Sequence, residues 1–235
     1  MGYLKLLLVR HGQSQGNRQG RMEGWHSTSL TTLGERQSEA LGKYLVEQGW
    51  HPTHIYCSPL LRARDSLEAI TRGFRQRQGE WSDGGIPAYS LASPDFREDL
   101  RESHQGIFTD LTWAEARDRY PDLCHRLETT LDWQPVPAAE SPLALRQRAQ
   151  GFVDHLIHAH ANGDRLWVIT HHGILLHIIA RLLGSDRTWK MAIGNTRCFE
   201  FWIDHSRWQD QGINQFNPEL WQIKRFNDGA HLENT

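Results

Sequence analysis

Short apolar runs recur along the chain, and each ends abruptly in polar residues. The clearest are residues 4–9, 54–57 and 166–169, which have the length of buried strands rather than of helices. Residues 196–203 and 220–226 predict two further strands. The sequence therefore predicts a sheet whose strands come from the whole length of the chain.

The segments between these runs carry apolar residues at helical spacing. From Thr32 the order Thr-Leu-Gly-Glu predicts a capping box, and a helix with a stripe of leucines extends from there to Gly49. A second helix is predicted over residues 61–74. Ser141 and Pro142 predict the N-cap and first residue of a third helix, and residues 174–183 predict a fourth, mostly buried helix.

Strands that alternate with helices indicate an α/β fold, and we expect a three-layer α/β/α sandwich with a mostly parallel central sheet. The chain has 235 residues and shows no linker, repeat or low-complexity tract, so residues 1–235 are expected to form a single domain. Residues 75–95 are rich in Gly, Gln, Ser, Asp and Pro, which predicts an exposed excursion. We expect a cap or lid segment inserted around residues 75–140.

Composition excludes several classes of partner. The formal net charge of −2 gives no electrostatic basis for binding nucleic acid or an anionic membrane, and no apolar run reaches the roughly 20 residues that span a bilayer. The three cysteines are far apart and form no CxxC pair, so neither a disulfide framework nor a thiolate zinc site is expected. A cytoplasmic location fits this composition best.

Cationic and imidazole side chains follow the predicted strands. Arg10 and His11 follow the first run, Arg62 the second and His171 the third. Parallel strands bring such residues to one edge of the sheet, where ligands bind in open α/β folds. Guanidinium groups match phosphate oxygens in pairs, and a neutral imidazole is a competent nucleophile toward phosphorus. The pattern therefore predicts a phosphate site.

Four sequence elements resemble those of one known family, the histidine phosphatase (phosphoglycerate mutase-like) superfamily. Residues 10–17, Arg-His-Gly-Gln-Ser-Gln-Gly-Asn, are similar to its RHG signature, and residues 58–63, Ser-Pro-Leu-Leu-Arg-Ala, to its SPLxRA element. Residues 100–102, Leu-Arg-Glu, resemble the segment with the family's acid, and residues 170–173, Thr-His-His-Gly, its second-histidine motif. The resemblance extends from residue 4 to about residue 232.

The resemblance implies a ping-pong phosphoryl transfer that uses neither metal nor cofactor. It implies a catalytic nucleophile, a proton donor and acceptor, and a group of side chains that hold the phosphoryl oxygens. By this resemblance the nucleophile is His11, and the proton donor and acceptor is Glu102. The side chains that hold the phosphoryl oxygens are Arg10, Asn17, Arg62 and His171.

Neighbouring residues leave alternatives open at three positions. Arg64 is an alternative to Arg62, but the preceding Ser-Pro element favours Arg62. His172 is an alternative to His171, but the order of strand, hydroxyl residue and histidine favours His171. The acids near Glu102 are Asp95, Glu98 and Asp99. After Gly106 the family's usual aromatic and acid are replaced by Ile107, Phe108, Thr109 and Asp110, which bears on the placement of the acid.

The chain has 14 histidines, so metal binding must also be weighed. His155, His158 and His160 cluster near the end of the third helix, without an HExxH motif or a nearby cysteine. We expect a surface cluster there rather than a zinc site.

The expected function is a phosphomonoesterase acting on a small phosphorylated metabolite. A cofactor-dependent phosphoglycerate mutase is the nearest alternative; such mutases carry a longer segment after the acid, with a Lys and paired Arg residues. Here 18 residues separate Glu102 from Pro121, with only Arg117 and Arg119 as candidates, which favours hydrolysis. A protein phosphatase or a non-catalytic binding module is a third alternative. The sequence leaves open the leaving group and whether the protein forms a homodimer.

Overall fold

The computed structural model describes residues 2–26, 28–82, 90–210 and 212–233. In this part of the chain a six-stranded sheet has the order β3-β2-β4-β1-β5-β6. Strands β3, β2, β4 and β1 are parallel, β5 runs antiparallel to β1, and β6 runs antiparallel to β5. The strands are β1 (Leu4–Arg10), β2 (His54–Cys57), β3 (Pro94–Phe96), β4 (Arg165–Thr170), β5 (Cys198–Ile203) and β6 (Trp221–Asp228).

Helices lie on both faces of this sheet. The α-helices are α1 (Gln15–Gln19), α2 (Thr32–Glu47), α3 (Leu61–Ser82), α4 (Trp113–Arg119), α5 (Pro121–Thr129), α6 (Pro142–Ala159) and α7 (His172–Leu182). Single turns of 3-10 helix include η1 (Glu98–Leu100), η2 (Gly106–Phe108) and η5 (Ala230–Leu232).

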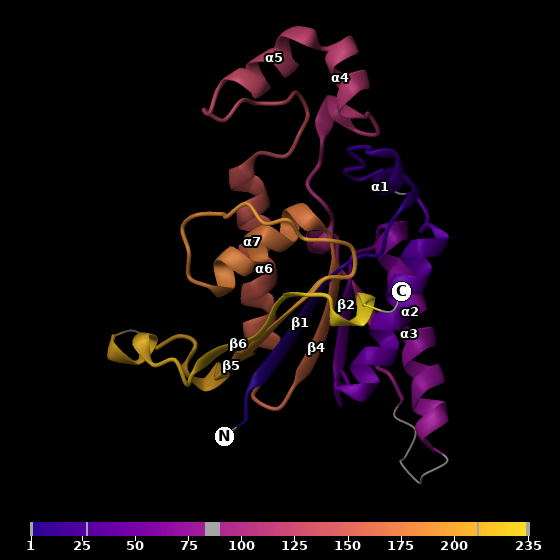
Figure 1. The fold of residues 1–235 in the computed structure, drawn as a ribbon. Helices are drawn as coiled ribbons and strands as arrows, with labels where there is room; N and C mark the ends of the chain where they lie inside the picture. Colours follow the sequence, from indigo (N-terminus) through magenta and orange to yellow (C-terminus); the bar gives the residue numbers. More distant parts are fainter. Residues whose placement is uncertain (1, 27, 83–89, 211, 234–235) are drawn as a thin grey trace.

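Alternation along the strands divides the core into two layers. Leu6 and Leu8 of β1 pack in the cluster that contains the apolar faces of α6 and α7. Leu7 and Val9 pack in the cluster formed with α2 and α3. Successive strand residues point to opposite faces, so a strand buried on both sides must be apolar at every position. Figure 1 shows α2 and α3 on one side of the sheet and α6 on the other. The predicted three-layer sandwich with a mostly parallel sheet is confirmed.

Helices α4 and α5 form a small separate layer beyond the carboxyl ends of the parallel strands (Figure 1). Its own core contains Phe108, Leu111, Ala116 and Cys124. A capping box starts α4, because the Thr112 hydroxyl accepts from the Glu115 N–H while the Glu115 carboxylate accepts from the Thr112 N–H. This layer falls in the segment where the sequence predicts a cap.

The predicted elements are present, with two corrections. The first predicted helix begins at Thr32 as expected, but its N-cap is Thr31, whose hydroxyl accepts from the N–H of Gly34. Helix α3 extends to Ser82, so the predicted excursion over residues 75–95 is wrong for residues 75–82, and residues 94–96 form β3. Residues 83–89 lie outside the described part. The helix continues past Phe74 because Arg, Gln and Glu side chains are good helix formers on an exposed face.

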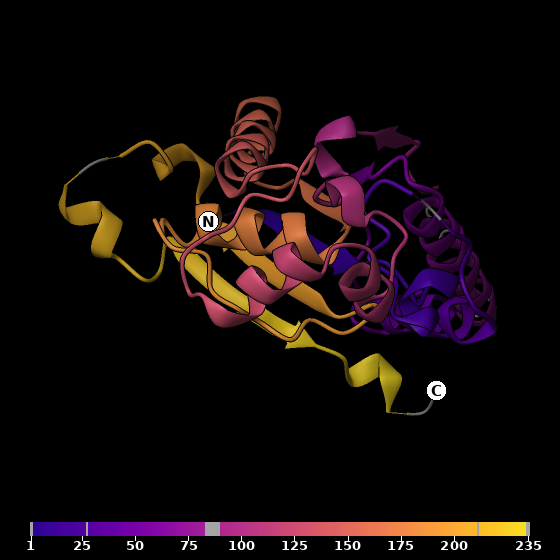
Figure 2. The same cartoon turned by 90° about the horizontal axis from the view of Figure 1, so that it is seen from above.

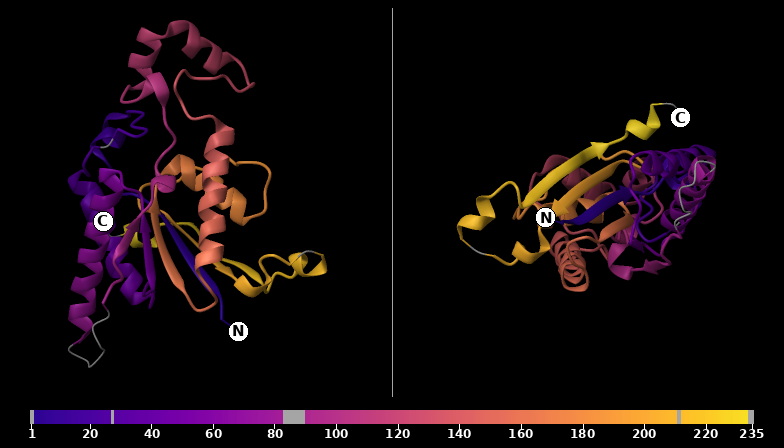
Figure 3. Two further views of the ribbon diagram at one scale, coloured as in Figure 1. Left: turned by 180° about the vertical axis from the view of Figure 1, so that it is seen from behind. Right: turned by 90° about the horizontal axis from the view of Figure 1, so that it is seen from below.

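The connection between β5 and β6 extends away from the body of the molecule. Figures 2 and 3 show it projecting to one side, with the C-terminal turn η5 returning toward α2. No helix among the described residues is long and apolar enough to cross a membrane. Cys57, Cys124 and Cys198 are free thiols.

Candidate active site

The ends of β1 and β4 bring two histidines together. Arg10 and Thr170 are paired in register at the ends of these parallel strands, and the N–H of His11 donates to the Thr170 carbonyl over 3.0 Å. The rings of His11 and His171 consequently lie with centroids 5.0 Å apart. Gly12 allows this segment to pack closely against the start of α2, since a Cβ at this position would lie 2.5 Å from the Gly34 carbonyl oxygen.

The environment of His11 fixes its tautomer. Nδ1 lies 2.7 Å from the carbonyl oxygen of Gly12, which can only accept, so Nδ1 carries the proton. Nε2 is then unprotonated and accepts a hydrogen bond from Nε of Arg62 over 3.2 Å. Burial lowers the pKa of His11 well below 6.5, and the charges of Arg62 and Arg10 lower it further. His11 is therefore a neutral imidazole with its lone pair on Nε2.

Arg62, near the start of α3, is buried and held from three sides. Its side chain is 1% exposed and donates to the carbonyl oxygens of His26 and Gly24, each over 2.9 Å, as well as to His11. Burial lowers the pKa of Arg62, and the carboxylate of Glu23 opposes this shift. Arg64, the sequence alternative, is exposed and lies over the ring of Phe96 instead.

Arg10 and Asn17 form one wall of the site. The guanidinium of Arg10 donates to the Ile193 carbonyl oxygen and, over 3.4 Å, to Oδ1 of Asn17. Its buried Nε has no hydrogen-bond partner among the described residues. Asn195 donates to both the His11 carbonyl and Oδ1 of Asn17, at 3.0 and 2.9 Å. Asn17 therefore positions Arg10, and Arg10 retains a donor for an anion.

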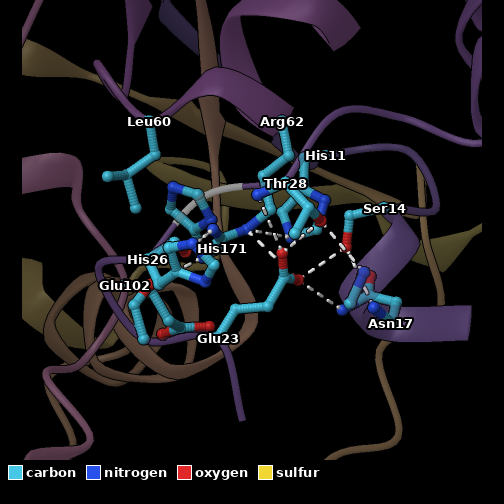
Figure 4. A network of polar contacts seen from close by, with 12 residues as sticks. His11, Ser14, Asn17, Glu23, His26, Thr28, Leu60, Arg62, Glu102 and His171 are labelled. Carbon is cyan, nitrogen blue, oxygen red and sulfur yellow. Dashed lines mark hydrogen bonds and ion pairs between the residues drawn. The ribbon is translucent and has the colours of Figure 1, made fainter. Parts of the chain in front are cut away.

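A buried carboxylate, Glu23, lies behind the cationic groups. It is 4% exposed, and its Oε2 lies 3.8 Å from Nε of Arg62. Oε2 also accepts from the Ser14 hydroxyl and from Nδ2 of Asn17, and Oε1 accepts from the Thr28 hydroxyl. Figure 4 shows Glu23 between Arg62 and Asn17. Its negative charge balances Arg62 while no anion is bound.

Glu102 reaches the site from the turn after η1. Its Oε1 accepts from the N–H groups of Ser103 and Gly173, at 2.8 and 2.9 Å, which places the carboxylate at the N-terminus of α7. Gly173 permits this approach, because a Cβ there would lie 2.4 Å from Oε1 of Glu102. The neighbouring acids are occupied elsewhere: Glu98 pairs with Arg101, and Asp99 with Arg97.

Side chains from distant segments hold this turn. Arg148 of α6 donates to the carbonyl oxygens of Asp99, Arg101 and Glu102, and it pairs with Glu140 over 2.6 Å. The indole N–H of Trp25 donates to the Glu102 carbonyl over 2.8 Å. The backbone that carries the acid is thus fixed from both sides of the cleft.

The two adjacent histidines after β4 have different surroundings. His171 is fully buried; its Nε2 lies 2.7 Å from the Ser58 hydroxyl, and its Nδ1 has no partner among the described residues. Burial lowers the pKa of His171 well below 6.5, with Arg62 as the next cause. His172 lies at the edge of the cleft, with Nε2 3.0 Å from the Met191 carbonyl oxygen.

A cleft of about 490 Å³ opens above these groups. Of the side chains predicted for the site, Arg10, His11, Asn17, Arg62 and Glu102 line it, while His171 lies against His11 beneath the surface. The other lining residues are Arg21, Met22, Glu23, Gly24, Gln105, His172, Ala192, Ile193 and Gly194.

Sequence reasoning missed several residues of this site. Glu23 follows no strand, and a carboxylate is not expected beside a phosphate on charge grounds. Asn195 lies in an irregular loop that carries no recognisable signal. Ser58 stands in an element that the sequence identified, and its position directly after β2 could have indicated a contact with the next strand end.

The fold and the cluster of buried imidazoles and guanidiniums define an α/β protein of the phosphatase class. The chain belongs to the histidine phosphatase superfamily (branch 1), whose family model matches residues 6–215. The family predicted from the four motifs is therefore confirmed.

One relative is similar in sequence and two solved structures are similar in fold. The chain is 26% identical over 231 residues to a metal-independent phosphoserine phosphatase of Arabidopsis thaliana, covering 97% of this chain and 83% of the relative. Its fold is similar to that of a phosphoglycerate mutase from Bacillus anthracis, with a TM-score of 0.72, 18% identity, and 98% and 96% of the two chains covered. A mycobacterial glucosyl-3-phosphoglycerate phosphatase gives a TM-score of 0.68, with 23% identity and 97% and 100% coverage.

Proposed function

We propose that this protein is a phosphomonoesterase that hydrolyses a small phosphorylated metabolite through a phosphohistidine on His11. The observation that carries the proposal is the unprotonated Nε2 of His11, which lies 3.2 Å from the Arg62 guanidinium in a buried cationic site. A neutral imidazole nitrogen beside fixed positive charge combines a nucleophile with stabilisation of the phosphoryl oxygens.

In the first half-reaction, Nε2 of His11 attacks phosphorus in line with the leaving oxygen. The N–P bond forms as the P–O bond to the leaving group breaks, and Glu102 gives its proton to the departing alkoxide. Arg10, Arg62, His171 and Asn17 hold the phosphoryl oxygens. Nε of Arg10 and Nδ1 of His171, which have no hydrogen-bond partner among the described residues, support this role.

In the second half-reaction, water attacks the phosphohistidine. Glu102, now a carboxylate, accepts the proton of that water, the N–P bond breaks, and inorganic phosphate leaves a neutral His11. The site balances two guanidiniums against the carboxylates of Glu23 and Glu102, so arrival of a phosphate dianion favours protonation of a carboxylate. Glu102 is the one of the two placed to exchange a proton with a leaving group, because Glu23 is enclosed by Ser14, Asn17 and Thr28.

Hydrolysis is favoured over the mutase alternative by the composition of the cleft. A mutase must hold its substrate's carboxylate with additional cations. Among the described residues that line the cleft, neither Arg117 nor Arg119 is present, and Arg117 pairs with Glu128. Arg21 does line the cleft, but its guanidinium is paired with Glu115 over 3.0 Å. The similar proteins that are named as phosphatases support the same conclusion.

We also propose a cytoplasmic location, on the basis of the free cysteines.

The test is release of inorganic phosphate, without added metal, from a panel of sugar phosphates, phosphoglycerates, phosphoserine and nucleotide phosphates. His11→Ala should lower kcat by a factor on the order of 10³ or more, whereas His158→Ala, on the exposed side of α6, should not. With a ³²P-labelled substrate, a base-stable and acid-labile label should be trapped on the wild type and not on His11→Ala. Full activity of His11→Ala would show that the nucleophile is another group.

A further inference from the structure

The three histidines near the end of α6 have different partners in the structure, although His155 and His160 both lie against the ring of Tyr56. Nδ1 of His158 lies 2.6 Å from the Asp154 carbonyl oxygen of its own helix, and Nε2 of His155 lies 3.4 Å from the Arg97 guanidinium. His160, the C-cap residue, contacts Asp164 four residues later and His54 at the start of β2. Of the three, His158 is exposed as expected, whereas His160 is buried and belongs to a second group of residues.

His160 forms a compact group with His54 and Asp164. One possible ligand atom of each residue lies within 4.8 Å of those of the other two. Nδ1 of His160 is 3.1 Å from Oδ2 of Asp164, and the rings of His54 and His160 have centroids 4.4 Å apart. Adjacent ligands of a tetrahedral zinc ion, with bonds of about 2.0–2.1 Å, are about 3.3 Å apart. The His160–Asp164 pair thus already has the spacing of two ligands.

One ring nitrogen of each histidine contacts a hydroxyl group. Nε2 of His160 lies 2.8 Å from the Tyr56 hydroxyl, and Nδ1 of His54 lies 2.9 Å from the Thr53 hydroxyl. Such a partner orients a histidine ligand, and a hydroxyl can accept the proton of one ring nitrogen when the other binds a metal. Burial lowers the pKa of His160, and the charges of Asp164, His54 and His155 are further causes of its shift.

We propose that His54, His160 and Asp164 bind a divalent transition-metal ion of the zinc type. Two imidazoles and one carboxylate are ligands that Zn²⁺ accepts, and the exposure of His54 leaves room for water in a fourth position. The site is separate from catalysis: His54 begins β2 and Asp164 precedes β4, whereas the catalytic groups follow the other ends of the strands. In Figure 1 the connection from α6 to β4 lies at the lower end of the sheet.

The bound ion would join two segments that are distant in sequence, His54 and the connection between α6 and β4 that holds His160 and Asp164. It would tie the start of β2 to the end of α6 and to the entry of β4, so binding to the folded state alone would stabilise the fold. The role is therefore structural, and phosphate release should not require the ion.

The experiment uses chelator-stripped full-length protein. Zn²⁺ is titrated by calorimetry, thermal unfolding is followed with and without Zn²⁺, and Co²⁺ is added as a probe with visible absorption. The wild type should bind one more ion than His54→Ala or Asp164→Asn, or bind it at least tenfold more tightly. Its Tm should rise with Zn²⁺, and the rise should be lost in both variants. His158→Ala, which alters a neighbouring exposed histidine, should behave as the wild type does.

The outcomes separate this site from the catalytic one. Equal stoichiometry and affinity in the wild type and His54→Ala, or no stabilisation of the wild type by Zn²⁺, would refute the proposal. Phosphate release that is lost on stripping and restored by Zn²⁺ would contradict a site separate from catalysis. His11→Ala should keep the Zn²⁺-dependent rise in Tm, so a wrong nucleophile assignment would leave this result intact.

Discussion

Nε of Arg62 donates a hydrogen bond to Nε2 of His11 over 3.2 Å, and both side chains are buried. A cation that donates to this nitrogen both keeps it unprotonated and marks where the phosphoryl group will enter. When phosphate arrives, the guanidinium can transfer its bond from the nitrogen lone pair to a phosphoryl oxygen. The same contact therefore keeps Nε2 of His11 available as the nucleophile and holds the guanidinium that would stabilise the phosphoryl oxygens.

The first prediction concerns the protonation state of His11. Its pKa is lowered well below 6.5, so the ring should remain neutral, with the proton on Nδ1, between about pH 6 and 7. Long-range ¹H–¹⁵N NMR spectra should show no titration of its signals in that range, and His11→Ala supplies the assignment. A ring that gains a proton there would contradict the account of the nucleophile.

The second prediction concerns Glu23. Glu23→Gln removes a negative charge 3.8 Å from Arg62, so inorganic phosphate should bind more tightly, by a factor on the order of ten. The free protein should be less stable because a buried ion pair is lost. Both effects are measured by calorimetric titration with phosphate and by thermal unfolding.

Glu200→Gln is the matched control, since Glu200 is also buried and pairs with Arg225 over 2.7 Å on a different part of the sheet. It should lower stability without changing phosphate affinity. Weaker phosphate binding by Glu23→Gln would mean that Glu23 acts mainly by holding Arg62 and Asn17 in place.

A third prediction tests the position of the acid through Gly173. In Gly173→Ala the new methyl group would lie 2.4 Å from Oε1 of Glu102 and must displace it. Turnover of alkyl phosphates should fall on the order of 10²-fold, whereas p-nitrophenyl phosphate, whose leaving group needs no proton, should be affected much less. Gly151→Ala meets no atom within 4 Å and should leave both rates unchanged. Equal losses on the two substrates would argue against Glu102 as the proton donor.

The fourth prediction concerns Arg148, which acts through the backbone that carries Glu102. Arg148→Lys cannot reproduce its bonds to the carbonyls of Asp99, Arg101 and Glu102 at once. We expect kcat for alkyl phosphates to fall roughly tenfold or more through misplacement of the acid, with KM little changed. Arg146→Lys on the same helix, where the side chain contacts Ser185 and Asp186, is the control. A change confined to KM would assign Arg148 to substrate binding instead.

The fifth prediction concerns acid stability. Burial lowers the pKa of His231 from 6.5 to about 4, so the unfolded chain takes up a proton before the native protein does. Stability is full above pH 6.5 and falls progressively toward pH 4; for this group the loss approaches roughly 3 kcal/mol. His231→Gln should flatten the pH dependence of the unfolding free energy across that range. The unfolding free energy is measured by urea titration at each pH. If its dependence on pH is the same in His231→Gln as in the wild type, the acid sensitivity belongs to other groups.

Much of the fold could be predicted because its signals are local. Apolar runs such as residues 4–9 identify strands through burial on both faces, and Pro142 marks a helix start through its fixed φ. The end of α3 was missed because polar helix formers on an exposed surface resemble a loop in composition. The predicted N-cap of α2 was one residue too late, because Thr31 and Thr32 are chemically equivalent and only the backbone conformation distinguishes them.

The sequence by itself determined the fold class, the family and the residues proposed for phosphate chemistry, because these follow strand ends and occur in recognisable motifs. Only the tertiary structure decided that Glu23 lies beside Arg62, that Arg148 and Gly173 place Glu102, and that His54 lies against His160 and Asp164. Each of these contacts joins segments far apart along the chain or lies in an irregular loop. Such distances depend on packing of the whole molecule, which no local pattern of residues records.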